Sequence, residues 1–147
     1  MNSLKSASRG FTLTEVLVVI ILIGMIIAFG IPSFVKTINR TDEKQAISHL
    51  KMIWEALQLH RAKSGTYQVG DLGDLNAINN ALGLYLVPAK ITFQCSSVGV
   101  DQETCRANGT GWSLIMDTQN VALGSGAIYC LAAGTCPTCQ ANGNGCN

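Results

Sequence analysis

The sequence predicts an α+β protein in which a long N-terminal helix packs on a small antiparallel sheet. Three observations support this fold class. An uncharged, mostly aliphatic run extends from Val16 to Val35. An amphipathic helical pattern continues from it to Lys63. Short β-patterned stretches separated by glycine-rich turns follow, and all six cysteines lie in that part, from Cys95 onward.

The composition restricts the function classes. The chain has 147 residues, enough for one domain with a modest core. Ten Lys and Arg residues against nine Asp and Glu residues leave no basic tract for nucleic-acid binding, so no specific nucleic-acid partner is predicted. Six cysteines, in a chain whose apolar N-terminal run is typical of exported or membrane-anchored proteins, indicate disulfides in an oxidising compartment, which argues against a cytosolic protein.

The apolar run near the N-terminus allows three interpretations. As a helix, Val16–Val35 has the length of the roughly 30 Å hydrocarbon core of a bilayer, so it could be a permanent membrane anchor. Lys5 and Arg9 would then stay on the cytoplasmic side. Alternatively it is a secretory signal, cut at the small-x-small step Ala28-Phe29-Gly30. In the third interpretation, cleavage occurs before the run and the mature protein keeps it.

Two residues favour cleavage before the run, between Gly10 and Phe11. Glu15 lies at the entrance to the apolar stretch, where a plain signal peptide has no use for a carboxylate. Pro32 would lie just past the Gly30 cut, a poor setting for signal peptidase. We therefore expect the apolar helix to survive maturation.

The same residues resemble the N-terminus of type IV prepilins and of the related pseudopilins of type II secretion. The matching features are Gly10, the segment Phe11-Thr12-Leu13-Thr14-Glu15, and an apolar helix with Gly24 and Pro32; the likeness covers about the first 55 residues. The resemblance implies cleavage after Gly10 by a prepilin peptidase and N-methylation of Phe11. It also implies residence in the bacterial inner membrane and extraction into a helical filament, by an assembly platform with a cytoplasmic ATPase motor.

Physical chemistry gives Glu15 a role in such a filament. Cleavage frees an α-amino group on Phe11, which could pair with a Glu15 carboxylate in a bundle of staggered helices. A lone carboxylate among apolar helices is costly, whereas a paired one is tolerated and sets axial register. Otherwise Glu15 simply lies at the level of the lipid headgroups. Gly24 and Pro32 are expected to soften or kink the helix, although both residues are common in membrane helices.

The second half of the helix carries one apolar stripe, at spacings of three and four: Ile38, Ala46, Ile47, Leu50, Ile53, Trp54 and Leu57. Ser64-Gly65 supplies a stop. We predict a leader at 1–10, a helix at 11–64 with its membrane or filament-core part at 11–35, and a head at 65–147. Trp54 is expected in the core. His49 and His60 are expected at the surface or boundary, without a metal.

The head is predicted from turn and strand signals. A short helix over 74–82 should be capped by Asp74 and ended by Gly83. Strand patterns occur at 91–95, 112–117 and 127–131, with turns at 107–111 and 124–126. Three or four short strands favour an antiparallel sheet. The alternation in 112–117 turns Trp112, Leu114 and Met116 toward the helix stripe.

The cysteines are the main candidates for covalent chemistry: Cys95, Cys105, Cys130, Cys136, Cys139 and Cys146. Six cysteines allow 15 pairings, and the sequence cannot select one. We expect Cys95 to pair with Cys105 and the last four to hold the tail. A zinc site from those four, or a redox motif at Cys136–Cys139, would need free thiolates, which an exported chain disfavours.

No other chemistry stands out in the sequence. It contains no recognisable catalytic set, and no cofactor or metal is predicted. Pseudopilins resemble this layout but bind calcium near the C-terminus, whereas Asp117 is the only acid after Glu103. The two matches to the N-glycosylation pattern, at Asn39 and Asn108, are best explained by chance. Helix packing explains the N-terminal phenylalanines without invoking electrical conduction.

We therefore expect a structural protein and not an enzyme. The leading hypothesis is a homo-oligomeric subunit of a type IV pilus-like filament, held in the inner membrane before assembly and displayed at the cell surface afterwards. The alternative is a minor pilin or pseudopilin of a secretion or DNA-uptake system.

Overall fold

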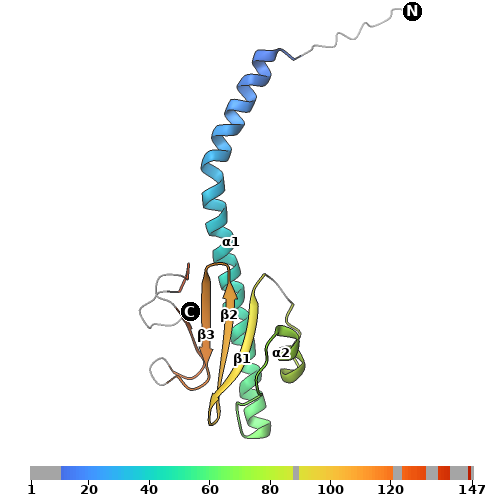
Figure 1. Cartoon of the computed structure of the whole chain (residues 1–147), viewed down its shortest axis with the longest axis vertical. Coiled ribbons are helices and arrows are strands. Elements are labelled where there is room, and N and C mark those ends of the chain that lie inside the picture. Colours follow the sequence, from blue (N-terminus) through green and yellow to red (C-terminus); the bar gives the residue numbers. More distant parts are fainter. Residues whose placement is uncertain (1–10, 88–89, 121–123, 132–135, 140–145, 147) are drawn as a thin grey trace, which may run out of the picture. The chain divides into compact units, whose positions relative to one another are not determined.

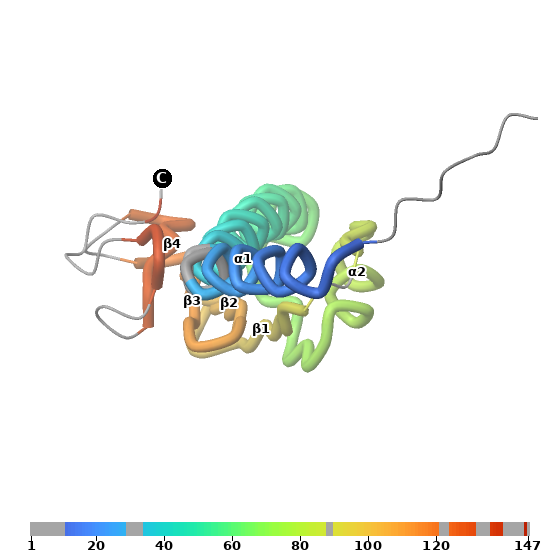
Figure 2. Tube along the Cα trace, turned by 90° about the horizontal axis from the view of Figure 1, so that it is seen from above, coloured from blue at the N-terminus to red at the C-terminus, as the bar shows by residue number. Residues whose placement is uncertain are grey.

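The computed structural model describes the backbone of residues 11–87, 90–120, 124–131, 136–139 and 146, and the side chains of these residues except 29–33. The chain divides into two compact units, Met1–Val35 and Lys36–Asn147, which are described separately. In chain order the elements are α1, α2 and strands β1 to β4 (Figure 1, with β4 labelled in Figure 2).

Helix α1, Leu13–Ser64, supplies the described part of the first unit and continues into the second. Its first turn forms because the Thr12 hydroxyl and carbonyl both accept a hydrogen bond from the Glu15 N–H, at 3.3 and 3.1 Å. The helix predicted at 11–64 starts two residues before the observed one, as is usual at helix ends, and ends at the same residue. The helix stops at Ser64, and Gly65 follows with a φ of 83°.

The predicted membrane span at 11–35 includes residues 29–33, whose side chains lie outside the described part of the chain. Within the described residues, no helical stretch has the length and apolar character needed to cross a membrane.

The second unit is built on a four-stranded sheet. Strands β1 (Thr92–Gly99), β2 (Gln102–Gly109), β3 (Trp112–Asp117) and β4 (Ala127–Cys130) lie in the order β1-β2-β3-β4, and every neighbouring pair is antiparallel. The sheet is thus a meander of hairpins, with the second half of α1 lying against one face (Figures 1 and 2). The α+β class expected from the sequence is confirmed.

The core lies between α1 and the sheet. Leu50, Ile53 and Leu57 of α1 are fully buried, as the apolar stripe predicts, and they belong to one hydrophobic cluster with Leu114 and Met116. Ile38 was expected in this stripe, but its side chain is 39% exposed. The buried part of α1 begins at residue 43, where the head starts to cover the helix.

The strand predictions need one added strand and three corrected boundaries. β2 was not predicted, because its sequence QETCRANG has no run of β-branched or aromatic residues; it is a strand because it hydrogen-bonds to β1 and β3 on both sides. The turn expected at 107–111 is shorter than predicted, since residues 107–109 belong to β2. Strand β1 extends to Gly99, and β4 ends one residue early, at Cys130.

Helix α2, Leu75–Leu82, agrees with its sequence signals. The Asp74 side chain accepts a hydrogen bond from the Ala77 N–H, and Gly83 adopts the left-handed conformation with a φ of 67°. Leu75 and Ile78 are buried.

Trp54 of α1 packs against the core as predicted, whereas His49 differs from its prediction. Trp54 is only half-buried, although it does pack against the core, and its ring stacks on Tyr67 with centroids 5.5 Å apart. Gly126 approaches the Trp54 ring so closely that a Cβ atom there would overlap it. His49, expected at the surface or the boundary, is buried with its ring 5.6 Å from that of Phe93. Burial lowers the pKa of His49, so the neutral imidazole is favoured.

Candidate functional site

The first candidate site is the start of α1. Gly10 lies outside the described residues, whereas Phe11 is described and its side chain is 79% exposed. Glu15 lies in the first helical turn and is exposed. A carboxylate at this position interacts favourably with the positive end of the helix dipole. It is also the only charged residue between Gly10 and Lys36.

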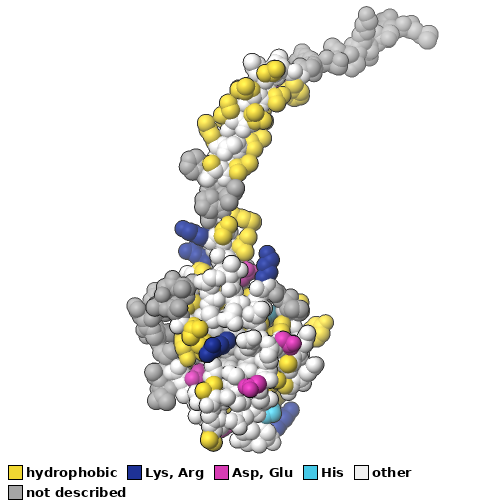
Figure 3. Space-filling model, in the orientation of Figure 1, with side chains coloured by type: hydrophobic (Ala, Val, Ile, Leu, Met, Phe, Trp, Pro, Cys, Tyr) yellow, Lys and Arg dark blue, Asp and Glu magenta, His cyan; other side chains and the backbone are white. Residues whose placement is uncertain are grey.

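The helix surface after Glu15 is apolar on every side. Val16 to Ile23 and Met25 to Ile27 all have large hydrophobic side chains that are exposed by 47% or more, and Figure 3 shows hydrophobic side chains along this segment. Gly24 has open space where its side chain would be, while the Pro32 side chain lies outside the described residues. A helix that is apolar all round is normally covered by lipid or by other helices.

The second candidate region is the cysteine-rich tail. The structure pairs Cys95 with Cys105, Cys130 with Cys136, and Cys139 with Cys146. The first bond crosses β1 and β2 at directly opposed positions. The other two close short loops in the tail, whose sequence is rich in Gly and Asn and poor in large apolar residues. Every cysteine is therefore in a disulfide, and none is free as a zinc ligand or redox thiol.

One buried acid was not recognised from the sequence. The Glu43 side chain is fully buried, and its carboxylate accepts hydrogen bonds from the backbone N–H groups of Thr138 (2.6 Å) and Cys139 (3.2 Å). Glu43 thus anchors the tail loop to α1. A signal was present: Glu43 lies three and seven residues before the core residues Ala46 and Leu50, on the apolar face where a carboxylate needs partners.

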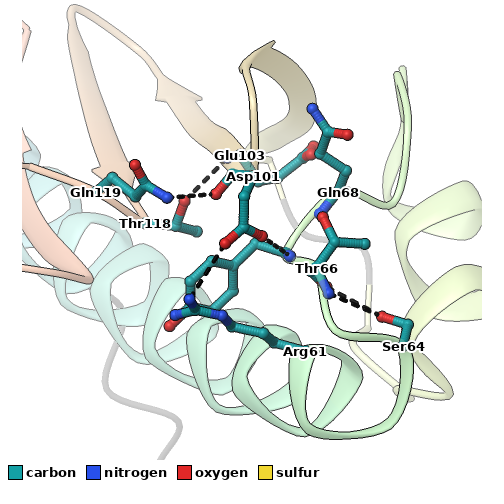
Figure 4. A network of polar contacts seen from close by, with 9 residues as sticks. Arg61, Ser64, Thr66, Gln68, Asp101, Glu103, Thr118 and Gln119 are labelled. Carbon is teal, nitrogen blue, oxygen red and sulfur yellow. Dashed lines mark hydrogen bonds and ion pairs between the residues drawn. The ribbon is translucent and has the colours of Figure 1, made fainter.

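A polar network joins the end of α1 to the sheet (Figure 4). Asp101, in the β1–β2 turn, accepts a 2.6 Å hydrogen bond from the Tyr67 N–H and forms an ion pair with Arg61 at 3.2 Å. The Asp101 carbonyl accepts a hydrogen bond from the Gln119 side chain at 2.7 Å. Asp101 has a φ of 57°, a conformation that Asp tolerates better than most residues. The network fixes the β1–β2 turn against α1 and the loop after β3.

The charges in this network support one another. The hydrogen bond from the Tyr67 backbone is the main cause that lowers the pKa of Asp101, helped by the Thr66 hydroxyl and the Arg61 charge. The pKa of Arg61 is raised, chiefly by a hydrogen bond with Tyr67, whose ring lies 4.4 Å beneath the guanidinium carbon. Both groups therefore stay ionised at neutral pH.

Glu103 lies beside this network and is fully buried. Its Oε2 accepts hydrogen bonds from the Ser97 hydroxyl (2.8 Å) and the Val69 N–H (3.5 Å), whereas Oε1 has no partner among the described residues. Burial raises the pKa of Glu103, and the nearby Asp71 charge adds to this effect. The two hydrogen bonds, and the charge of His60, act in the opposite direction.

The described part of the chain offers no cluster for a metal ion. No three His, Cys, Asp or Glu residues there come together in a suitable way. The Asp117 carboxylate already accepts hydrogen bonds from the Gln102 side chain and the Gln119 N–H. The arrangement as a whole suits assembly and packing: an uncovered apolar helix segment and a small disulfide-bonded head define a pilin-like protein.

Comparison with known proteins agrees with this class. Residues 5–31 match the prokaryotic N-terminal methylation motif. The chain is 28% identical over 64 residues to the type II secretion system core protein G of Vibrio cholerae (44% of each chain). It is 29% identical over 76 residues to the core protein G of Aeromonas hydrophila (52% of each chain).

A pilin is also among the relatives. The type IV major pilin protein PilA of Myxococcus xanthus is 39% identical over 49 residues, which cover 33% of this chain and 22% of that protein. The matched segments span about half the length of the core protein G relatives, and no solved structure matches the chain. The N-terminal part of the chain is thus similar to type IV pilins and to the pseudopilins of type II secretion.

Proposed function

We propose that the chain is a structural subunit of a type IV pilus-like filament, assembled through its N-terminal helix. The observation that carries this proposal is the segment after Glu15, where α1 exposes large apolar side chains on all sides. Such a surface needs lipid before assembly and neighbouring helices afterwards. Moving the apolar helix segment from lipid into a bundle of helices exposes little apolar surface to water. Extraction from the membrane therefore needs an external motor but little net desolvation.

Maturation of the subunit forms part of the proposal. A prepilin peptidase cleaves between Gly10 and Phe11 and frees the Phe11 amino group, which becomes methylated. Glu15 of one subunit then pairs with the cationic N-terminus of a neighbour and sets the axial register. The methylation-motif match at residues 5–31 and the position of Glu15 in the first turn of α1 support these steps.

The proposed partners and locations follow from this role. The subunit resides in the inner membrane through residues 11–35 and associates with other copies of itself. An assembly platform with a cytoplasmic ATPase motor extracts it into a surface filament. The disulfide-bonded head faces outward, in an environment that keeps cysteines oxidised.

A second candidate, a pseudopilin of a type II secretion system, is favoured by the matches to core protein G relatives. Electron microscopy of sheared surface material separates the two candidates. Abundant long fibres containing this chain support a pilin. Their absence, with the protein retained in a short envelope structure, supports a pseudopilin.

The decisive test is the intact mass of the exported polypeptide, measured without reductant. We expect a chain that begins at Phe11, carries one added methyl group, and lacks six hydrogens because of three disulfides. The same sample after reduction should gain those six hydrogens. A mature product that begins at Ile31, without the apolar segment, would refute the proposed function.

A further inference from the structure

The part of α1 that follows the apolar run carries a basic stripe, which we define as Lys36, Arg40, Lys44 and Lys51. All four side chains are exposed. At about 100° per residue, their positions fall within an arc of about 80° on one side of the helix. The stripe therefore concentrates positive charge along a single face.

The stripe has no carboxylate partner in the described part of the chain, where the only salt bridge joins Arg61 to Asp101. Asp42 projects about 200° away from Arg40 around the helix axis, so it lies on the opposite side. Glu43 is buried, and both of its oxygens accept hydrogen bonds from the tail loop. The four cations are thus available to an external anion.

The two cations nearest the apolar run line a surface depression. Its other lining residues are Asn39 and, from the tail loop, Pro137. Arg presents a planar fork of donors that suits phosphate oxygens, Lys adds a point charge, and the Asn amide can donate a further hydrogen bond. This combination suits a phosphodiester. Lys44 and Lys51 line a separate depression with Ile47 and Ser48.

We propose that the depression at Lys36, Asn39 and Arg40 binds the headgroup of an anionic phospholipid while the subunit waits in the membrane. This inference rests on the membrane residence in the proposed function. Lys36 directly follows the uncharged stretch, so it and Arg40 would lie at headgroup depth. Lys44 and Lys51 lie about 12 and 22 Å further along the helix than Lys36, beyond the headgroups. The bound lipid would hold the subunit at a defined depth before extraction.

The test uses the full chain in detergent micelles supplied with phosphatidylglycerol or with phosphatidylcholine, and native mass spectrometry counts the bound lipids. Lys36→Gln with Arg40→Gln removes the two proposed ligands. Lys44→Gln with Lys51→Gln is the matched control, since it removes the same charge from the same stripe. We expect wild type and control to prefer phosphatidylglycerol, and the first variant to bind it on the order of thirtyfold more weakly, about fivefold per charge.

Four other outcomes would each contradict a different part of the proposal. Equal loss in both double variants would show a diffuse charge effect and overturn the site. Displacement of phosphatidylglycerol by millimolar inorganic phosphate would show a free-phosphate site and overturn the lipid assignment. Equal binding of the two lipids by wild type would also overturn the site. Sedimentation with membranes after alkaline washing tests membrane residence separately: failure there refutes the proposed function itself.

Discussion

Three carboxylates of this protein show how environment decides what a side chain does. Glu15 is exposed at the start of α1 and is free to meet a partner. Glu43 is buried but satisfied, because two backbone N–H groups donate to it. Glu103 is buried and only half satisfied, because Oε1 has no partner among the described residues. Burial removes the hydrogen bonds that a carboxylate makes with water. The charged carboxylate is therefore destabilised unless protein groups donate hydrogen bonds in their place.

Glu103 leads to a prediction on pH dependence. Its pKa in the folded chain lies above the ordinary value of 4.5, so the folded state binds more protons than the unfolded state between those two pKa values. The free energy of unfolding should therefore fall as pH rises through that window, and this loss of stability should persist at neutral pH, where Glu103 is ionised in the unfolded chain. Glu103→Gln should remove this decline and stabilise the head by on the order of 1 kcal/mol at pH 7.

Urea unfolding of the full chain in detergent, followed by tryptophan fluorescence from pH 4 to 8, measures this effect. The control is Glu55→Gln, since Glu55 is exposed on α1 and should leave the pH profile unchanged. A Glu103→Gln protein that is less stable at pH 7, and keeps the wild-type decline, would contradict the assignment.

At the scale of elements, the head is held on α1 by a hydrophobic interface with a polar contact at each end. The interface consists of the α1 stripe and the inner face of the sheet. At one end Glu43 anchors the tail loop, and at the other Arg61 meets Asp101 of the β1–β2 turn. These polar contacts fix which part of the sheet faces which turn of the helix, because a shift along α1 would leave buried groups unpaired.

Glu43→Gln tests the tail anchor. The amide keeps the shape of the side chain but turns a donor toward the N–H of Thr138 or Cys139, so one hydrogen bond is lost and two donors face each other. We expect a loss of about 1–3 kcal/mol in the free energy of unfolding. Hydrogen exchange, read by mass spectrometry, should show faster exchange in the peptide that contains residues 136–139.

A neighbouring acid provides the control for this substitution. Asp42 lies next to Glu43 on α1 but is only half-buried and has no hydrogen bond with the described tail residues 136–139, so Asp42→Asn should leave exchange there unchanged. If both variants exchange alike and both match wild type, Glu43 does not hold the tail loop.

For the whole molecule, the division at Val35 and Lys36 separates two kinds of surface. The first unit exposes apolar side chains and has Glu15 as its one charge after Gly10. The second unit has its own core, six disulfide-bonded cysteines and mixed charges. The second unit thus holds within itself the core and the crosslinks that stabilise it.

Glu15→Ala tests the proposed assembly at this scale. The variant should still be cleaved after Gly10 and remain in the membrane, because its apolar run is intact, but fibre growth should fall by at least tenfold as the pairing with the Phe11 amine is lost. Immunoblots of sheared surface material measure fibres, and membrane fractions report the subunit pool. Glu55→Ala, on the exposed face of α1 in the head, is the control. Wild-type fibres from the Glu15 variant would rule out the pairing role.

Prediction from the sequence succeeded where the signal is local. The α1 stripe, the Asp74 and Gly83 caps of α2, and the alternation in β3 all depend on residues within a few positions of one another. It failed at β2, whose strand character comes from its two neighbours, and at His49, which is buried because the sheet reaches further over α1 than the stripe alone indicates.

The sequence by itself determined the uncharged N-terminal run, the single acid at its entrance and the helical period that continues it, because these follow from the order of residues along one helix. The sequence also led to the Cys95–Cys105 pair, which is confirmed, whereas only the tertiary structure decided the partners of the last four cysteines, the Glu43 anchor and the Arg61–Asp101 contact. The Glu43 anchor and the Arg61–Asp101 contact join groups that are far apart in the chain, and such groups meet only after the sheet has folded onto α1. The disulfide partners are only 6 to 10 residues apart, but six cysteines close together in sequence allow many short-range pairings.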